Sequence, residues 1–480
     1  MMDQGNTPVF DGLLEYIRKQ KVSFHVPGHK GGLVFPEKAA PFFRQVLPFD
    51  ATEVANLDDL SRPTGILREG EALLSDYYGT RSSYYLVNGS TVGNLIMVLA
   101  ACARGDTVFV QRDSHKSVFN ALQLAGVRPV FLAPAIDPGS GLAAGIAEEA
   151  WEAAIRRFPE TRALILTYPN YYGMAPDVGQ LIEKAHAAGL SVLVDEAHGP
   201  HFKMGPPVPP STLDMGADLV VHSAHKMLPA MTMGAYLHIN TARVPAEKVE
   251  AIREMLQTSS PSYAIMASLD LARYYMANLD QTERSRIFAA RNAFVRALKD
   301  MEKIHVLEPR PGLFRLDPFK ITLELDTGES GFDWQERLIA SGVYPELADP
   351  HHVLFTLGLT GRIDYRQALS RMARTLRESR GKAVWHRPEG ALFPKWTTIA
   401  LPYGALSAME KQEIKLNEAA GRIAAEHVVP YPPGIPAVVR GERVTEESLK
   451  AIESWKSAGA VFQNRSIDSG RINVYRTGEI

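Results

Sequence analysis

The chain has 480 residues, of which 45% are hydrophobic and 22% charged, a composition typical of globular proteins rather than disordered or fibrous chains. Its 52 Lys and Arg residues and 54 Asp and Glu residues give a net charge of −2, which argues against a nucleic acid as the main partner. The single cysteine, Cys102, excludes an intrachain disulfide and any zinc or iron–sulfur site built on several cysteines.

The first 70 residues are rich in Pro and Gly and have few periodic apolar runs, so residues 1–70 are predicted to form an arm that crosses a surface. This segment lacks the basic start and apolar run of a secretory signal. The longest apolar stretch, residues 95–103, is far shorter than the ~20 residues that span a bilayer. We therefore expect a cytoplasmic protein without a membrane partner, in a reducing compartment.

Residues 71–280 alternate between short apolar runs and amphipathic segments, a pattern typical of an α/β domain with a mostly parallel sheet. Seven strands are predicted, over 84–87, 107–110, 128–132, 163–167, 191–194, 219–222 and 234–239. Helices are predicted between them, over 91–103, 116–125, 148–158 and 178–188, with Gly105, Gly126 and Gly189 as C-caps.

The remainder of the chain is predicted to be a smaller α+β domain, residues 281–480. A long charged periodic segment, 268–301, is expected to be one helix that leaves the α/β domain. Strands are expected over 321–325 and 353–357. The sequence shows no internal repeat and no low-complexity tract.

Two side chains follow apolar strands at what should be one edge of the sheet. Lys226 follows Val220 and Val221, and the apolar residues after it would desolvate its ammonium and lower its pKa. Asp195 ends the run 191–194, where a carboxylate must be paired or hydrogen-bonded. An amine and an acid at the carboxyl edge of a parallel sheet suit pyridoxal phosphate: the lysine forms a Schiff base and the aspartate keeps the pyridine nitrogen protonated.

The cofactor would also need an anion site and a wall beside its ring. The segment NGSTVGN, from Asn88, follows a strand and opens a helix, so backbone N–H groups and the hydroxyls of Ser90 and Thr91 would face a phosphate. A plain N-cap is the alternative interpretation of these hydroxyls. His115 follows the next strand, where an imidazole could stack on a flat ring; a loop histidine with local partners is the alternative.

Eight segments of the chain resemble the sequence motifs of one protein family. The segments are HVPGHKGG, LDDLSRPTG, NGSTVGN, SHKSVF, VDEAHG, SAHKMLPAMTMG, TSSPSY and PYPPGIP. Together and in this order, from about residue 7 to the C-terminus, they resemble the ornithine/lysine/arginine decarboxylases, which are fold-type-I, aspartate-aminotransferase-like enzymes dependent on pyridoxal 5'-phosphate. The overall form is similar to the compact Gram-positive members without a wing domain.

The resemblance implies a role for each matched residue. Lys226 is implied as the Schiff-base lysine, Asp195 as the pyridinium partner and His115 as the stacking histidine, with His198 lining the pocket and Ala197 beneath the ring. Phosphate contacts are implied for the loop and the strand end that follow, namely Gly89, Ser90, Thr91, Ser223 and His225. Glu346 looks like the acid that receives the substrate's distal cationic group. One departure is Tyr168, where relatives commonly place Asn.

The function implied is decarboxylation of arginine, lysine or ornithine to the corresponding di- or polyamine and CO₂. His198 or the released Lys226 is the candidate proton donor to Cα. The segment TSSPSY resembles one that reaches the neighbouring subunit's cofactor, which implies a homodimer or higher oligomer with the active site at the interface.

Other classes of protein fit the sequence less well. The tetrad Asp195–His198 also occurs in helicases, but no P-loop accompanies it. Histidine pairs such as His198 and His201 suggest a metal hydrolase, but HExxH is absent. The glycines of segment 139–145 are a poor match to a dinucleotide loop and predict a turn. An aminotransferase or another amino-acid lyase of the same fold stays open, because fold alone does not decide which Cα bond breaks.

Overall fold

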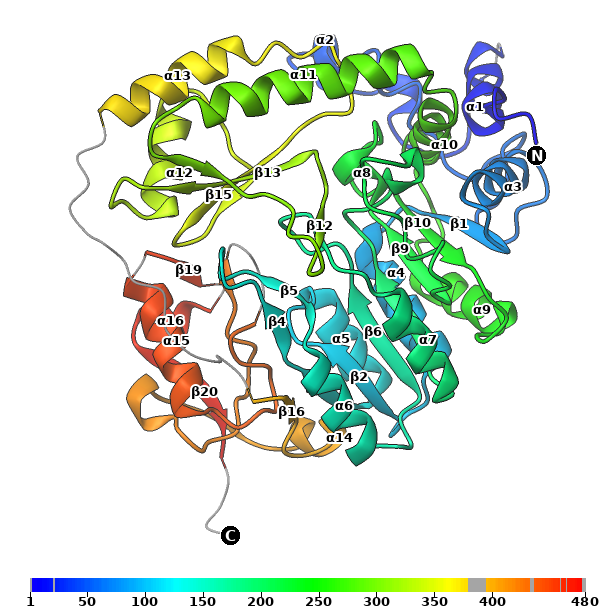
Figure 1. The fold of residues 1–480 in the computed structure, drawn as a ribbon. Coiled ribbons are helices and arrows are strands. Elements are labelled where there is room, and N and C mark those ends of the chain that lie inside the picture. The colour runs from blue at the N-terminus through cyan, green and yellow to red at the C-terminus, as the bar shows by residue number, and fades with distance from the viewer. Residues whose placement is uncertain are drawn as a thin grey trace.

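The computed structural model describes residues 2–19, 22–378, 394–431, 436–457, 459–462 and 464–476. Its centre is an eight-stranded sheet with helices on both faces (Figure 1). The strands, in sheet order, are β1 (Ser82–Leu86), β10 (Ala235–Ile239), β9 (Leu219–His222), β8 (Ser191–Asp195), β6 (Ala163–Thr167), β2 (Thr107–Gln111), β3 (Arg128–Leu132) and β16 (Trp396–Thr398). Only β10 and β16 run against the others, so the predicted mostly parallel sheet is confirmed.

The seven predicted strands are all present, and β16 is an addition to them. This strand comes from the C-terminal part of the chain and pairs antiparallel with β3, with Trp396 opposite Leu132. Its three residues are too few to give a recognisable alternation in the sequence.

Alternate residues of the strands pack into different cores on the two faces of the sheet, as a period of two requires. In β8, Val192 and Val194 belong to the core on one face and Leu193 to the core on the other. Helices α4 (Gly89–Ala101), α5 (Lys116–Ala125) and α9 (Ala246–Leu256) cover the second face, and α6 (Glu148–Arg157) and α7 (Gly179–Ala187) cover the first. The strands therefore lie buried on both sides, which explains their continuous apolar runs.

The predicted glycine C-caps are present at some helix ends and absent at others. Gly126 caps α5 in a left-handed conformation with φ 66°, as predicted. Gly105 does not cap α4, which ends at Ala101 with the extended residue Cys102 as its C-cap.

The prediction of one long helix over 268–301 is wrong. Two helices are present, α10 (Tyr263–Ala277) and α11 (Gln281–Lys299). The break has a local cause, because the Asp280 carboxylate accepts a hydrogen bond from the Glu283 N–H at 2.7 Å and so starts a new helix.

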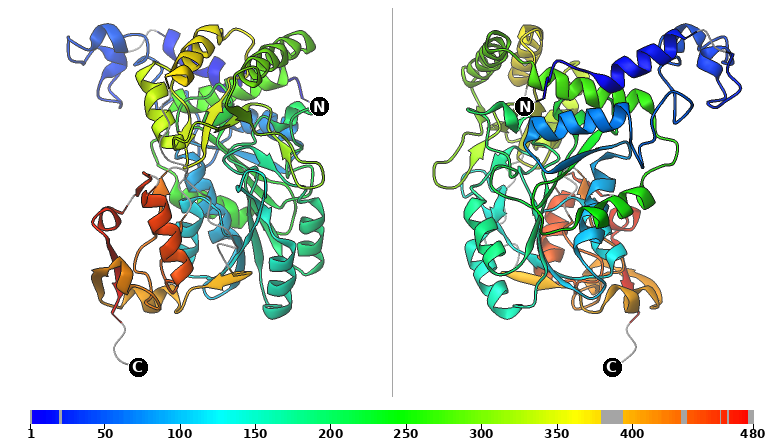
Figure 2. Two further views of the ribbon diagram at one scale, coloured as in Figure 1. Left: turned by 60° about the vertical axis from the view of Figure 1, so that its left-hand side comes forward. Right: turned by 90° about the vertical axis from the view of Figure 1, so that its right-hand side faces the viewer.

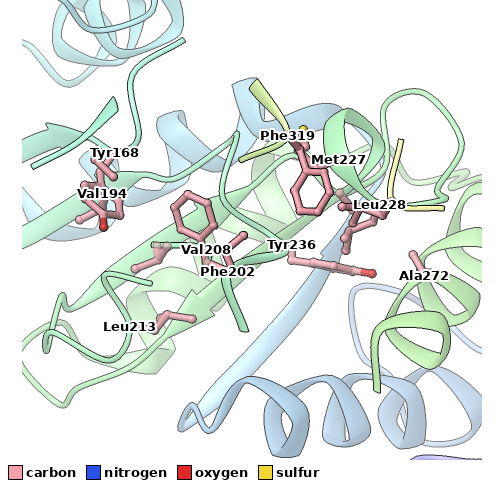
Figure 3. Packing of buried hydrophobic residues seen from close by; sticks show 14 of the residues in the cluster. Tyr168, Val194, Phe202, Val208, Leu213, Met227, Leu228, Tyr236, Ala272 and Phe319 are labelled. Carbon is pink, nitrogen blue, oxygen red and sulfur yellow. The ribbon is translucent and has the colours of Figure 1, made fainter. Parts of the chain in front are cut away.

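Beyond α11 the chain forms a four-stranded antiparallel sheet, in the order β11 (Ile304–Val306), β13 (Lys320–Leu325), β15 (His352–Thr356) and β14 (Leu347–Ala348). Helices α12 (Gly331–Ala340) and α13 (Arg366–Arg377) accompany it. The two strands predicted here correspond to β13 and β15. Figure 3 shows part of the core that this sheet shares with the large one: Met227 and Leu228 lie in the same cluster as Phe319.

Residues 394–476 add β16 to the large sheet and also have a core of their own, which includes Leu416, Val438, Ile452 and Val474. This part contains α14 (Tyr403–Ser407), α15 (Glu446–Ser457) and the pair β17 (Lys411–Lys415) and β20 (Arg471–Tyr475). Residues 432–435 of the segment PYPPGIP lie outside the described residues. The domain boundaries at residues 70 and 280 stay predictions.

The N-terminal segment begins with a helix that the sequence did not suggest, α1 (Pro8–Arg18), which buries Val9, Leu13 and Tyr16. This helix packs on α10 and on α3 (Ile66–Tyr78). The residues between α1 and α3 have little regular structure, and in the right-hand view of Figure 2 this blue segment projects from the body of the molecule. None of the helices among the described residues is long and apolar enough to cross a bilayer.

Candidate active site

A cavity of about 860 Å³ opens at the carboxyl ends of the parallel strands, where open α/β sheets bind ligands. Ten of the eleven predicted site residues line it, namely Gly89, Ser90, Thr91, His115, Asp195, Ala197, His198, Ser223, His225 and Lys226. They come from four different strand ends, after β1, β2, β8 and β9. The sheet thus brings together residues far apart in the sequence.

Lys226 lies in the one-turn helix α8 (Ala224–Met227) directly after β9. Its Nζ is 3.0 Å from Nε2 of His198. Burial lowers the pKa of the Lys226 amine, while Asp195 and Glu346 oppose that shift. Burial, with the Lys226 charge next in size, also lowers the pKa of His198 well below its usual value. The imidazole is therefore neutral, and its Nε2 can accept a hydrogen bond from the amine.

Asp195 is the last residue of β8 and is 3% exposed. Its Oδ2 accepts a hydrogen bond from Asn94 Nδ2 at 2.8 Å, and its Oδ1 accepts one from the Ala197 N–H at 3.2 Å. These two donors fix the orientation of the carboxylate at the cavity wall.

His115 is the N-cap of α5. Its Nδ1 accepts from the Ser117 N–H at 3.3 Å and lies 2.8 Å from the Ser117 hydroxyl. The residue is exposed and lines the cavity, and partial desolvation of its ring lowers the pKa of His115.

The N-terminus of α4, where an anion site is predicted, lies at one end of the cavity. Gly89 adopts a left-handed conformation with φ 75°, and the hydroxyls of Ser90 and Ser223 are 2.5 Å apart. A Cβ at Gly93 would lie 2.3 Å from a methyl group of Val221, so glycine there lets α4 approach β9 closely. The close approach brings the start of the helix beside Ser223, which follows β9.

Glu346 is not among the residues that line the cavity. It is exposed, and Tyr171 links it to the site, because the Tyr171 hydroxyl donates to Glu346 Oε1 at 2.9 Å. The Tyr171 ring lies 4.4 Å from the His198 ring and 5.7 Å from Lys226 Nζ.

Sequence reasoning assigned no role to Tyr171, Lys320 or Asn94, which all stand beside predicted residues. Lys320 opens β13, is 1% exposed and donates to Thr356 Oγ1 at 3.0 Å; its Nζ lies 5.6 Å from the Tyr171 ring. Burial lowers the pKa of Lys320 to about 8. Asn94 stands inside the motif NGSTVGN, which was the one available signal, whereas Lys320 is an ordinary strand lysine in the sequence.

The structure gives little support to a metal-hydrolase site or a dinucleotide-binding loop. His198 bonds Lys226, whereas His201 bonds Asp317 at 3.1 Å, so the two rings do not share a centre. Within the described ranges, no three His, Cys, Asp or Glu side chains group as a metal site requires. The glycine segment 139–145 begins in the turn of the hairpin β4 (Pro134–Ile136) and β5 (Ala143–Ile146), as predicted, and ends inside β5. The Tyr168 hydroxyl donates to the Pro210 carbonyl at 2.8 Å.

A buried chain of hydrogen bonds lies beneath the site, next to Asp195. It runs from Glu196 through His222 (3.1 Å) and His238 (3.0 Å) to the Ser83 hydroxyl (2.7 Å). Both rings are fully buried. A carboxylate can only accept, so the Nε2 of His222 donates its hydrogen to Glu196.

We expect the buried histidines of this hydrogen-bonded network to make the protein less stable in mild acid. Burial and the neighbouring His222 lower the pKa of His238 well below its usual value. The unfolded chain therefore binds more protons below about pH 6.5, and the free energy of unfolding should fall by about 2 kcal/mol per such histidine between about pH 7 and about pH 5. Urea unfolding at the two pH values should show a smaller difference for His238→Gln than for the wild type. The exposed His305→Gln is the control, and an unchanged difference in His238→Gln would contradict the expectation.

The mostly parallel sheet, with its cavity at the carboxyl edge, is the fold of pyridoxal-phosphate-dependent transferases. Comparison with known proteins identifies the group more narrowly. Residues 7–312 match the family model "Orn/Lys/Arg decarboxylase, major domain", and residues 394–464 match "Orn/Lys/Arg decarboxylase, C-terminal domain". The chain belongs to the Orn/Lys/Arg decarboxylase family, so the resemblance seen in the sequence is confirmed.

Individual relatives agree with this assignment. The chain is 40% identical to the uncharacterized protein YaaO of Bacillus subtilis, over 98% of both chains. It is 32% identical to an arginine decarboxylase of the same organism, over 96% of both chains. Among solved structures it is similar to the constitutive lysine decarboxylase of E. coli, with a TM-score of 0.79, 20% identity and coverage of 99% of this chain and 82% of that one.

Proposed function

We propose that this protein is a pyridoxal-phosphate-dependent decarboxylase of a basic amino acid, namely arginine, lysine or ornithine. The observation that carries the proposal is the meeting, in one cavity, of the Lys226 amine, the Asp195 carboxylate and the hydroxyl-lined start of α4. The relatives named arginine decarboxylase and lysine decarboxylase support the substrate class.

The donor chemistry of the cavity fits this cofactor. Backbone N–H groups at Gly89, with the hydroxyls of Ser90, Thr91 and Ser223, would hold a phosphate. His225 would lie beside the phosphate, held in place by the hydrogen that its Nδ1 donates to the Gly234 carbonyl at 3.0 Å.

The remaining residues would contact the heterocycle. Asp195 would hold a proton on the ring nitrogen, His115 would lie on one face and Ala197 beneath the other. When bound, the cofactor supplies an electron-accepting ring for the bond that breaks at Cα.

The residues of this chain would bind the substrate and move its protons. Lys226 Nζ and His198 Nε2 form a 3.0 Å hydrogen bond, and both side chains are candidate donors to Cα. Glu346 would attract the distal ammonium or guanidinium, and Tyr171 fixes the Glu346 carboxylate by the 2.9 Å hydrogen bond.

One observation favours an aminotransferase as a second candidate. Such an enzyme needs a cation for the substrate carboxylate, and Arg362 lines a cavity of about 650 Å³ that Lys226 also lines. Arg310 is less suited to binding the substrate carboxylate, because its guanidinium already pairs with Asp137 at 2.9 Å.

The experiment that decides between the two incubates the purified, cofactor-loaded protein with arginine, lysine and ornithine separately. Decarboxylation predicts equal amounts of CO₂ and one amine from at least one of them. Turnover that requires a keto acid and releases no CO₂ would establish the aminotransferase and overturn the proposal.

We also propose that the protein is a homodimer or a higher oligomer. Eight large apolar side chains of the projecting segment are exposed, an arrangement that marks an interaction surface: Val22, Phe24, Val26, Leu33, Val34, Phe42, Phe43 and Val46. The base of this segment is fixed to the motif TSSPSY, because the Tyr263 N–H donates to the Ala51 carbonyl at 3.0 Å. A second copy of the chain would cover both the exposed apolar side chains and the motif TSSPSY.

Charged substitutions on this surface should therefore separate the subunits. Phe24 is 94% and Phe42 80% exposed, so the double variant Phe24→Asp, Phe42→Asp should fold but sediment as a monomer. Val461→Asp, which changes a 66% exposed residue of the C-terminal part, should leave the mass of the wild type. A double variant that keeps the wild-type mass would place the interface elsewhere.

A further inference from the structure

Asn94 lies below the cavity, on the face of α4 that packs against the sheet, and is 1% exposed. One of its amide hydrogens is donated to Asp195 Oδ2 at 2.8 Å and the other to Ser117 Oγ at 2.9 Å. A single side chain thus contacts both the proposed ring-nitrogen partner and the residue that holds His115.

The direction of every hydrogen bond in this chain follows from Asp195. A carboxylate only accepts, so the amide nitrogen of Asn94, and not its oxygen, must face it. Ser117 Oγ then accepts from Asn94, and its own hydrogen goes to His115 Nδ1, 2.8 Å away. The Ser117 N–H points at the same nitrogen from 3.3 Å. The neutral His115 ring therefore carries its hydrogen on Nε2.

Packing alone does not account for an asparagine at this position. Asparagine is a poor helix former, and burying an amide costs free energy unless its hydrogen bonds are made. Among the described residues, Oδ1 of Asn94 has no partner, whereas both hydrogens of Nδ2 are used. The side chain is thus suited to donating, in two directions at once.

We propose that Asn94 is a positioning residue for the cofactor, which orients the Asp195 carboxylate and, through Ser117, fixes the tautomer and orientation of His115. This inference rests on the proposed pyridoxal phosphate site. It couples the group at the ring nitrogen to the group on the ring face, so one substitution should disturb both.

The test compares Asn94→Asp with Asn94→Ala, measuring the dissociation constant for pyridoxal phosphate by titrating cofactor-free, full-length protein. N94D is isosteric but sets a second carboxylate against Asp195, whereas N94A only removes the donors. We expect N94A to weaken binding about 10-fold and N94D about 100-fold near neutral pH. The affinity of N94D should recover as the pH falls, because the introduced carboxyl then carries a proton.

Asn240→Asp is the matched control. Asn240 also donates both amide hydrogens to buried acceptors, the carbonyls of Leu213 and Ala217 at 2.9 Å each, but it does not line the cavity. N240D should bind the cofactor like the wild type. If N94D also binds like the wild type and N94A is the weaker variant, Asn94 acts by packing and the inference is wrong. A wild-type protein that does not bind the cofactor would instead overturn the proposed function.

A second substitution keeps the inference testable should N94D not fold. Ser117→Ala removes the link to His115 and leaves the bond to Asp195, so it should weaken binding about 3- to 5-fold. Because Asn94 and Ser117 act in one chain, adding S117A to N94A should cost less than S117A alone. Strictly additive losses would contradict the coupling.

Discussion

Lys226→Ala is expected to abolish two properties together: the decarboxylation of the preferred amino acid and the near-visible absorbance of the bound cofactor. Among the described residues that line the cavity, Lys226 is the one lysine, and burial lowers the pKa of its amine and keeps more of it neutral and nucleophilic. We expect turnover to fall on the order of 10³-fold or more. Steady-state CO₂ release and an absorbance spectrum measure the two effects.

The control for this substitution is Lys203→Ala. Lys203 is a partly exposed lysine that pairs with Asp214 at 3.4 Å and does not line the cavity, so its loss should leave both readouts unchanged. Lys226→Arg keeps a positive charge but has no free amine, and it should fail as Lys226→Ala does. A Lys226→Ala protein that keeps its absorbance band would show that another residue holds the cofactor.

Asp195→Asn should have the second largest effect, a loss of turnover on the order of 10²- to 10³-fold. The substitution preserves the volume of the side chain but removes the negative charge that would hold a proton on the ring nitrogen. It also sets an uncharged amide against the Asn94 amide that now donates to Oδ2 at 2.8 Å. The measurement is kcat with the same amino acid, at saturating cofactor, so that weaker cofactor binding does not mask the chemical step.

Asp214→Asn is a suitable control, because Asp214 is a surface carboxylate whose ion pair with Lys203 lies outside the cavity. It should leave kcat unchanged. Should Asp195→Asn retain wild-type turnover, the carboxylate would have a structural role only, and the assignment of the ring-nitrogen partner would have to be abandoned.

The sequence predicts the parts of the site that depend on strand ends. A short β-branched run such as 191–194, preceded by Gly189, indicates a buried strand, and the polar residue after it is then expected at the sheet edge. Asp195 and Lys226 were found in this way, and their meeting in one cavity follows from the parallel sheet. The antiparallel strand β16 and the helix break at Asp280 depend instead on three residues and on one capping bond, signals too small for periodicity to detect.

The contacts between side chains could not be predicted in the same way. Asn94 and Asp195 are 101 residues apart, and Tyr171 and Glu346 are 175 apart, so their hydrogen bonds depend on how helices and hairpins pack. Lys320 illustrates the limit best. A lysine at the start of a strand is normally solvated, and only the packing of β13 against the large domain buries its amine beside Tyr171.

The strand β16 also has a consequence for the solubility of shortened forms of this protein. It covers the outer edge of β3, and the Trp396 ring packs edge-on against Phe158 at 5.0 Å. A buried ion pair, Arg112 to Glu442 at 2.9 Å, joins the same two parts of the chain. A truncation before residue 394 would leave the outer edge of β3 unpaired, and such a bare edge is a template for intermolecular strand addition and hence aggregation.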